Sequence, residues 1–164
     1  PLAALGYQGG QALILGAGGA AKAAVVALGL LKCRVMIAAR RARANNDVFS
    51  IFKQVHEIGL LTDSLAMQRA FSTCDLIIQA TPLGRNHESH DLPWELLRPK
   101  VIAFDMLYKP MRTPFIEQAE ARGASVIYGW QMLLHQGARA FEIWTQQTAP
   151  LLTMQRALLS DLGK

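Results

Sequence analysis

Apolar and polar positions follow one another along the chain in blocks that predict strands separated by helices. Continuous apolar runs, typical of strands buried in a parallel sheet, occupy residues 11–15, 34–39, 75–80, 101–105 and 124–128. Between these runs the apolar residues recur at helical spacing, which predicts helices over 20–31, 47–58, 64–71, 114–122, 129–144 and 150–162. Such alternation is typical of an α/β fold with a doubly wound, mostly parallel sheet.

Single residues mark the ends of several of these elements. Pro114 fits the first position of a helix with Thr113 as its N-cap, and Asp63 or Ser64 caps an earlier helix. A short strand is predicted over 60–62 and a helical turn over 93–97. We interpret residues 1–164 as one domain, in which 1–10 end an inter-domain helix or linker and 148–164 hold a C-terminal helix.

A glycine-rich turn follows the first predicted strand. Gly16, Gly18 and Ala21 stand in the spacing G-x-G-x-x-A, and Gly19 is a further residue without a side chain. Between a strand and a helix, these residues allow a tight turn, a close approach to a pyrophosphate and close helix packing. The N–H groups at the helix start then face the phosphates. The turn predicts a dinucleotide site; a plain strand-to-helix turn is the alternative.

The end of the second predicted strand indicates which dinucleotide binds. Sites that prefer NAD usually carry Asp or Glu there, but this chain has Arg40, Arg41 and Arg43. A carboxylate would repel a ribose 2′-phosphate, whereas guanidinium groups bind it through paired hydrogen bonds. We therefore predict NADP as the cofactor. The alternative interpretation is a solvated basic turn.

Composition and charge exclude several other classes of protein. The 164 residues carry a formal net charge of +5, but the sequence has neither a lysine-rich tail nor an aromatic ladder, so we expect no nucleic-acid partner. No apolar run is long enough to span a membrane. Cys33 and Cys74 form no C-x-x-C motif and the histidines form no metal motif, so we expect a reduced, cytoplasmic protein without a metal site.

Four motifs at predicted strand ends together resemble those of the shikimate dehydrogenase family. They are the glycine turn 16–20, the segment Ala80-Thr81-Pro82-Leu83-Gly84, residues 105–110 with Thr113-Pro114, and the long motif 129–144. The motifs stand in the family's order and extend over nearly the whole chain. They match the C-terminal, NADP-binding, Rossmann-type domain of that family.

The resemblance implies the reversible NADPH-dependent reduction of 3-dehydroshikimate to shikimate, a step of aromatic amino acid biosynthesis. It implies a pyrophosphate cradle at Gly16, Ala17, Gly18, Gly19 and Ala20. It also implies a clamp for adenine and 2′-phosphate at Arg40, aided by Arg41 or Arg43. Thr81, Leu83 and Met106 would line the nicotinamide and its ribose, Gly129 would meet the carboxamide, and Met132 would pack on the ring.

Other residues of these motifs would serve the substrate or the core. Tyr108 and Gln136 would reach the small-molecule substrate across a cleft, although Tyr108 can instead brace its loop. Met132 lies on an apolar helix face that also fits a core role, and Trp144 is assigned to packing with Phe141. Thr81 before Pro82 also fits ordinary turn chemistry.

The resemblance also implies what this chain lacks. In the family, the Lys–Asp pair that handles the proton belongs to an N-terminal domain, and no residue here replaces it, so we assign no catalytic residue. We expect that domain to be missing, this fragment alone to be inactive, and a homodimer to be one form of the enzyme. Asp105 is interpreted as holding the loop that follows it, and Arg85 stands where the family usually has Met.

Three other functions stay open from the sequence. The first is a quinate- or shikimate-type paralogue with the same cofactor domain. The second is a non-catalytic module that senses nucleotides and regulates another process, because a fold does not fix a function. The third is another NADP reductase, such as one acting on folate, which the Tyr108 and Gln136 motifs disfavour.

Overall fold

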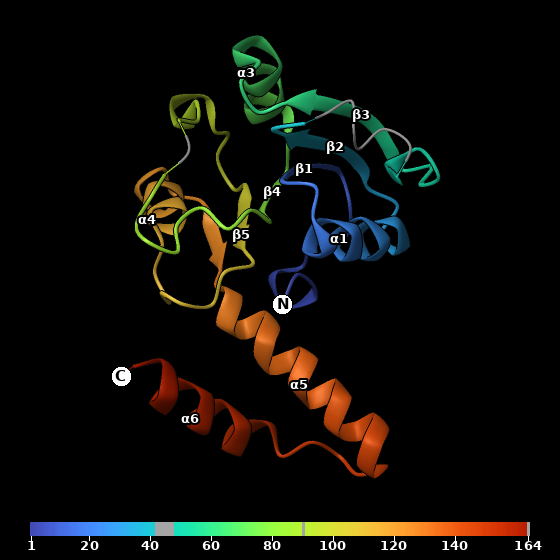
Figure 1. The fold of residues 1–164 in the computed structure, drawn as a ribbon, viewed down its shortest axis with the longest axis vertical. Coiled ribbons are helices and arrows are strands. Elements are labelled where there is room, and N and C mark those ends of the chain that lie inside the picture. Colours follow the sequence, from blue (N-terminus) through green and yellow to red (C-terminus); the bar gives the residue numbers. More distant parts are fainter. Residues whose placement is uncertain (42–47, 90, 164) are drawn as a thin grey trace.

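The computed structural model describes residues 1–41, 48–89 and 91–163, which form a parallel six-stranded sheet with helices around it (Figure 1). The strands are β1 Gln11–Leu15, β2 Arg34–Ala39, β3 Val55–Leu60, β4 Leu76–Gln79, β5 Ile102–Asp105 and β6 Ser125–Ile127. They lie in the order β3-β2-β1-β4-β5-β6, which is the strand order of dinucleotide-binding sheets. The prediction of a doubly wound α/β fold is confirmed.

Helices cover both faces of this sheet (Figure 1). The faces are covered by α1 Gly19–Leu30, α3 Ser64–Thr73, α4 Pro114–Ala121 and the 3-10 turn η2 Trp94–Leu96. The chain also forms the 3-10 turn η1 Ala3–Leu5 and the helices α5 Gly129–Thr145 and α6 Leu151–Leu162. Asp63 caps α3 by accepting a hydrogen bond from the Ala66 N–H, and Thr113 caps α4 in the same way from Ile116. The predicted caps are therefore confirmed, with Asp63 rather than Ser64 in that role.

Two hydrophobic cores lie on opposite faces of the sheet, because successive strand side chains point to opposite sides. Leu13 of β1 belongs to the core under α3, η2 and α4, where the rings of Phe71 and Trp94 meet edge to face at 5.5 Å. Its neighbour Ile14 belongs to the core under α1, together with Val25. Burial on both faces explains why the strands read as continuous apolar runs.

The prediction of a helix over 47–58 is wrong from residue 50 onward: residues 48 and 49 are helical, and residue 47 lies outside the described residues. The chain turns over residues 50–54 and then runs as β3 along the edge of the sheet, where Met36 pairs with Glu57 and Ala39 with Leu60. The turn is held by Gln54, whose carbonyl accepts a hydrogen bond from the Val35 N–H at 2.8 Å. Because β3 is a half-buried edge strand without strict alternation, apolar residues three and four apart imitated a helix.

Helices α5 and α6 form an arm that extends away from the sheet, with α6 returning alongside α5 (Figure 1). The two helices pack against each other at Gly137, where a methyl group would make an ordinary contact of 3.5 Å with the Met154 Cε. The assignment of Trp144 to packing is wrong within this chain, since its side chain is 81% exposed near the end of α5. Ile143 and Leu152 of the arm are also exposed. The arm therefore presents apolar surface.

Candidate functional site

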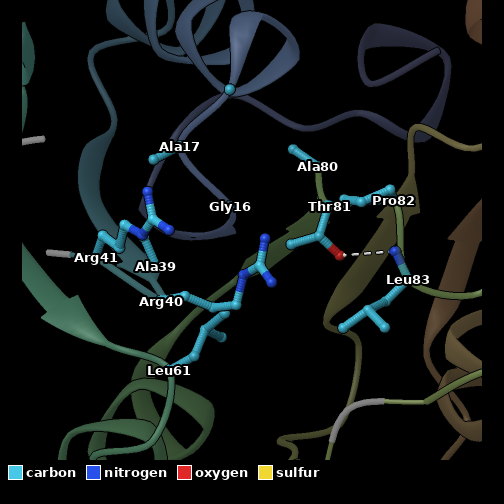
Figure 2. A pocket seen from close by; sticks show the side chains of 11 residues that line it. Gly16, Ala17, Ala39, Arg40, Arg41, Leu61, Ala80, Thr81, Pro82 and Leu83 are labelled. Atoms are coloured by element: carbon cyan, nitrogen blue, oxygen red, sulfur yellow. Dashed lines mark hydrogen bonds between the residues drawn. The ribbon is translucent and has the colours of Figure 1, made fainter.

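A pocket of about 490 Å³ opens at the carboxyl ends of β1 and β4. From β1 the sheet continues through β2 and β3 on one side and through β4, β5 and β6 on the other. The order of the strands therefore reverses between β1 and β4, and ligands of such sheets bind at this point. The lining comes from the glycine turn, the end of β2, the start of the segment after β3 and the segment after β4 (Figure 2): Gly16, Ala17, Gly18, Ala39, Arg40, Arg41, Leu61, Ala80, Thr81, Pro82 and Leu83.

Gly16 lets the floor of this pocket form. Its φ of +111° is a conformation that side chains rarely adopt, and its N–H donates to the Ala38 carbonyl at 2.8 Å. A Cβ at this position would lie 2.8 Å from the carbonyl oxygen of Ala80. Only glycine therefore allows the turn after β1 to pass so close to the segment that follows β4.

The glycines at the start of α1 meet a different environment. A Cβ built on Gly18 or Gly19 would find no atom within 4 Å, so nothing in the described protein requires them to be glycine. Gly18 is the N-cap of α1 and no side chain caps the helix. The backbone there is consequently open to an anion, which the N–H groups of a helix start and the helix dipole both favour.

Arg40 and Arg41 bring positive charge to the opposite wall. They follow directly after β2, and Figure 2 shows their side chains extending toward the glycine turn and the segment after β4. Both arginines are exposed at the mouth of the pocket, where a ligand can reach them. Amide groups and guanidinium groups therefore face the same space, which suits a ligand with more than one phosphate.

Gln79 supports the wall that the segment after β4, residues 80–83, adds to the pocket. Sequence reasoning missed this role. Gln79 is 1% exposed at the end of β4, and its Oε1 accepts hydrogen bonds from the Thr81 N–H and hydroxyl at 3.2 and 3.0 Å. Its amide donates to the Leu83 carbonyl at 3.2 Å, while the Thr81 hydroxyl receives the Leu83 N–H. A polar residue ending an otherwise apolar strand was the available signal, because buried amides need partners.

The loop after β5 is fixed by contacts next to this pocket. The buried Asp105 carboxylate accepts hydrogen bonds from the Leu107 N–H at 2.9 Å and from the Thr113 hydroxyl. The first residue of α5, Gly129, lies against the Leu107 carbonyl so closely that a Cβ would come within 2.0 Å of its oxygen. Asp105 thus holds the loop that follows it, as the sequence suggested.

Comparison with known proteins gives this geometry a context. A sequence profile described as the Shikimate 5'-dehydrogenase C-terminal domain matches residues 129–159. The NADP(+) shikimate dehydrogenase of Archaeoglobus fulgidus is 35% identical over 156 residues, covering 94% of this chain and 58% of that protein. The chain belongs to the shikimate dehydrogenase family. It corresponds to the family's C-terminal part and spans little more than half the length of the curated relative.

Solved structures of the family agree with the fold. The Listeria monocytogenes shikimate dehydrogenase in complex with shikimate and NAD superposes with a TM-score of 0.85 at 28% identity, covering 96% of this chain and 59% of that one. The Thermus thermophilus enzyme with NADP(H) and shikimate gives 0.75 at 30% identity, covering 90% and 53%. One of these structures contains NAD and the other NADP(H). The preference of this chain between NAD and NADP therefore has to be argued from its own residues.

The remaining residues singled out from the family motifs lie outside the lining of the pocket. Met106 and Met132 are half-buried and pack against the core under α1. Tyr108 is exposed and lines a second cavity beside the loop after β5. Gln136 is exposed on α5, and Gly19 and Ala20 open α1 beside the glycine turn. Arg43 lies outside the described residues.

The described residues carry neither a metal cluster nor a membrane span. Within residues 1–41, 48–89 and 91–163, no three histidine, cysteine or acidic side chains gather where they can hold a metal ion. The helices among those residues lack the length and apolar character that crossing a bilayer requires. Cys33 and Cys74 are both buried free thiols.

The buried carboxyl of Asp105 makes the free energy of unfolding of this chain depend on pH. Burial raises the pKa of this carboxyl to about 6, although its hydrogen bonds with Thr113 and Leu107 favour the charged form. Because the folded pKa lies above the unfolded one, stability is greatest when Asp105 is protonated and falls as pH rises from about 4 to about 6, by roughly 3 kcal/mol. We expect Asp105→Asn to remove this part of the slope in urea unfolding between pH 4 and 7.

The exposed N-cap residue Asp63 supplies the control for that experiment. Asp63→Asn keeps the cap acceptor and leaves Asp105 in place, so the slope should persist. An unchanged slope in Asp105→Asn would contradict the assignment.

Proposed function

We propose that this chain binds NADP(H) and forms the cofactor half of an NADPH-dependent shikimate dehydrogenase, which reversibly reduces 3-dehydroshikimate to shikimate. One observation carries the proposal: Gly16, Gly18, Arg40 and Arg41 line the same pocket at the reversal point of the sheet. Backbone amides and guanidinium groups there suit the pyrophosphate and the 2′-phosphate of a single ligand. The names of the relatives supply the reaction.

The residues fit the cofactor in a definite order along the sheet edge. Ala17, Gly18, Gly19 and Ala20 would cradle the pyrophosphate, and Arg40 with Arg41 would hold the 2′-phosphate. Thr81 and Leu83 would line the nicotinamide ribose. Met106, Gly129 and Met132 would lie at the nicotinamide ring. When bound, NADPH supplies the hydride. The contribution of this chain is to fix the dinucleotide at the edge of the sheet, with Tyr108 and Gln136 meeting the substrate.

A second domain would supply the proton-handling groups and most of the substrate site. Two observations support this part of the proposal. The curated relative is longer than this chain, which covers 58% of it. The arm of α5 and α6 exposes Ile143, Trp144 and Leu152, a surface that a neighbouring domain would bury. Buried free thiols at Cys33 and Cys74 suit a reducing compartment, so we place the enzyme in the cytoplasm.

Calorimetric titration of this chain with NADPH and with NADH tests the proposed cofactor. We expect NADPH to bind at least about tenfold more tightly, since the 2′-phosphate adds charge-assisted hydrogen bonds worth about 1.5–3 kcal/mol. Adenosine 2′,5′-bisphosphate, which carries the 2′-phosphate without the nicotinamide, should compete with NADPH. Equal affinity for the two dinucleotides would contradict the assignment of the arginines.

A further inference from the structure

The amide group of Gln79 extends from a backbone that is held on both sides. Gln79 pairs with Leu15 of β1 on one side and with Asp105 of β5 on the other. Its own carbonyl accepts a hydrogen bond from the Met106 N–H at 3.0 Å. The side chain lies against residues 80–83, the segment that lines the pocket. Strand pairing therefore fixes the point from which Gln79 reaches this segment.

Two backbone groups decide which way round this amide lies. The Thr81 N–H can only donate, and its nitrogen lies 3.2 Å from Oε1 of Gln79. The Leu83 carbonyl can only accept, and its oxygen lies 3.2 Å from Nε2 of Gln79. Exchanging the two ends of the amide would set a donor against a donor and an acceptor against an acceptor. The oxygen of the amide therefore faces Thr81 and its nitrogen faces Leu83.

This orientation settles what the Thr81 hydroxyl can do. The hydroxyl oxygen lies 3.0 Å from Oε1 of Gln79 and 3.2 Å from the Leu83 nitrogen. Because Oε1 has no proton to give and the Leu83 N–H can only donate, the hydroxyl donates to Gln79 and accepts from Leu83. A hydroxyl carries a single proton, and here the protein takes it. Thr81 consequently has no hydrogen bond to donate to a ligand.

The methyl group of Thr81 faces the glycine turn instead. A Cβ built on Gly16 would lie 3.0 Å from Cγ2 of Thr81. Figure 2 shows the hydroxyl turned away from Gly16, to the Leu83 nitrogen. Leu83 adds its apolar side chain to the same wall, whereas the opposite wall carries Arg40 and Arg41. A ligand whose phosphates lie at the arginines and the glycine turn therefore meets an apolar surface beyond them.

We propose that Gln79 is a positioning residue for the nicotinamide half of the cofactor. Its amide keeps the polar groups of Thr81 and Leu83 turned into the protein, so that the segment presents apolar surface to the ligand. Without this amide the Thr81 N–H and the Leu83 carbonyl lose their partners, and the segment must turn them toward water at the expense of the wall. That this wall meets the nicotinamide half rests on the proposed function, in which the 2′-phosphate lies at Arg40.

Calorimetric titration with NADP+ and with adenosine 2′,5′-bisphosphate separates this role from a general structural one, because the second ligand lacks the nicotinamide half. Gln79→Met keeps the length of the side chain and removes its hydrogen bonds. We expect this variant to bind NADP+ about tenfold more weakly, and adenosine 2′,5′-bisphosphate within about twofold of wild type. Gln118→Met changes an exposed glutamine of α4 and is the matched control, with both affinities unchanged.

Gln79→Glu tests the two directions of hydrogen bonding. As a neutral carboxyl the new side chain can accept from Thr81 and donate to the Leu83 carbonyl, but once ionised it can only accept. Burial raises the pKa of a carboxyl. We therefore expect nearly wild-type affinity for NADP+ at pH 5 and about tenfold weaker binding at pH 8. The neighbouring carboxyls, Asp105 on β5 and Glu88 beside the same small cavity, titrate in both proteins, so the ratio of variant to wild-type affinity removes their effect.

The outcomes separate the positioning role from the proposed function. Equal weakening of both ligands in Gln79→Met, wild-type affinity for NADP+ in that variant, or a deficit in Gln79→Glu that does not change with pH would overturn the role of Gln79. If Gln79→Met does not fold, the affinity ratio of Gln79→Glu at the two pH values decides alone. A wild-type chain that binds neither NADP+ nor adenosine 2′,5′-bisphosphate would instead refute the proposed function.

Discussion

Replacing Arg40 and Arg41 together with alanine is expected to weaken NADPH binding about 100-fold while changing NADH binding less than about threefold. The two guanidinium groups line the pocket beside the glycine turn, and each charge-assisted contact with a phosphate is worth about 1.5–3 kcal/mol. Their exposure reduces this figure, so we expect about 3 kcal/mol for the pair. Isothermal titration calorimetry with both dinucleotides measures the difference.

Arg34→Ala with Arg69→Ala is a matched control for this double variant. It removes two exposed arginines that lie away from the pocket, near the amino end of β2, and lowers the net charge by the same amount. Its affinity for NADPH should fall only by the loss of long-range attraction, which salt screens. If both double variants lost the same affinity, general charge and not a 2′-phosphate contact would explain the effect.

Gly129→Ala is expected to produce the largest loss of stability, about 3 kcal/mol, which corresponds to a fall in Tm of about 10 °C for a chain of this size. The added methyl group would lie 2.0 Å from the Leu107 carbonyl oxygen and 2.8 Å from the Tyr108 nitrogen. Backbone atoms cannot move aside as a flexible side chain can, so the start of α5 and the loop after β5 must separate. Thermal unfolding followed by circular dichroism measures the change.

Gly137→Ala tests the same substitution further along the same helix. A methyl group there would lie 3.5 Å from the Met154 Cε, an ordinary contact with a flexible side chain. Alanine also favours a helix by about 1 kcal/mol relative to glycine, so the Tm should stay constant or rise. Similar losses in both variants would show that the close contact at Gly129 has no special weight.

The sequence predicted the parallel sheet and the position of the pocket because both depend on local patterns. Buried runs on both faces, a glycine turn after β1 and an N-cap at Thr113 are each visible within a few residues. The rule that ligands bind at the carboxyl ends of parallel strands then predicts that Arg40 lies next to Gly16. These features needed no knowledge of distant contacts.

What the sequence could not show depends on long-range packing. The periodicity of β3 predicts a helix, but its pairing with β2 decides its conformation as an edge strand. Gln79 supports the pocket wall only through hydrogen bonds to Thr81 and Leu83, which form after the chain leaves the sheet. The cavity that Arg85 lines beside the loop after β5 likewise needs the end of α6, more than seventy residues away, to complete it.

The hydrogen bonds of Gln79 imply that the wall after β4 is already rigid before any dinucleotide arrives. Thr81 and Leu83 share these bonds, so a ligand does not have to freeze that segment. The exposed Arg40 side chain, by contrast, forfeits up to about 2 kcal/mol of rotamer freedom when it holds a phosphate. The entropic cost of binding the cofactor is consequently smaller at the segment after β4 than at Arg40.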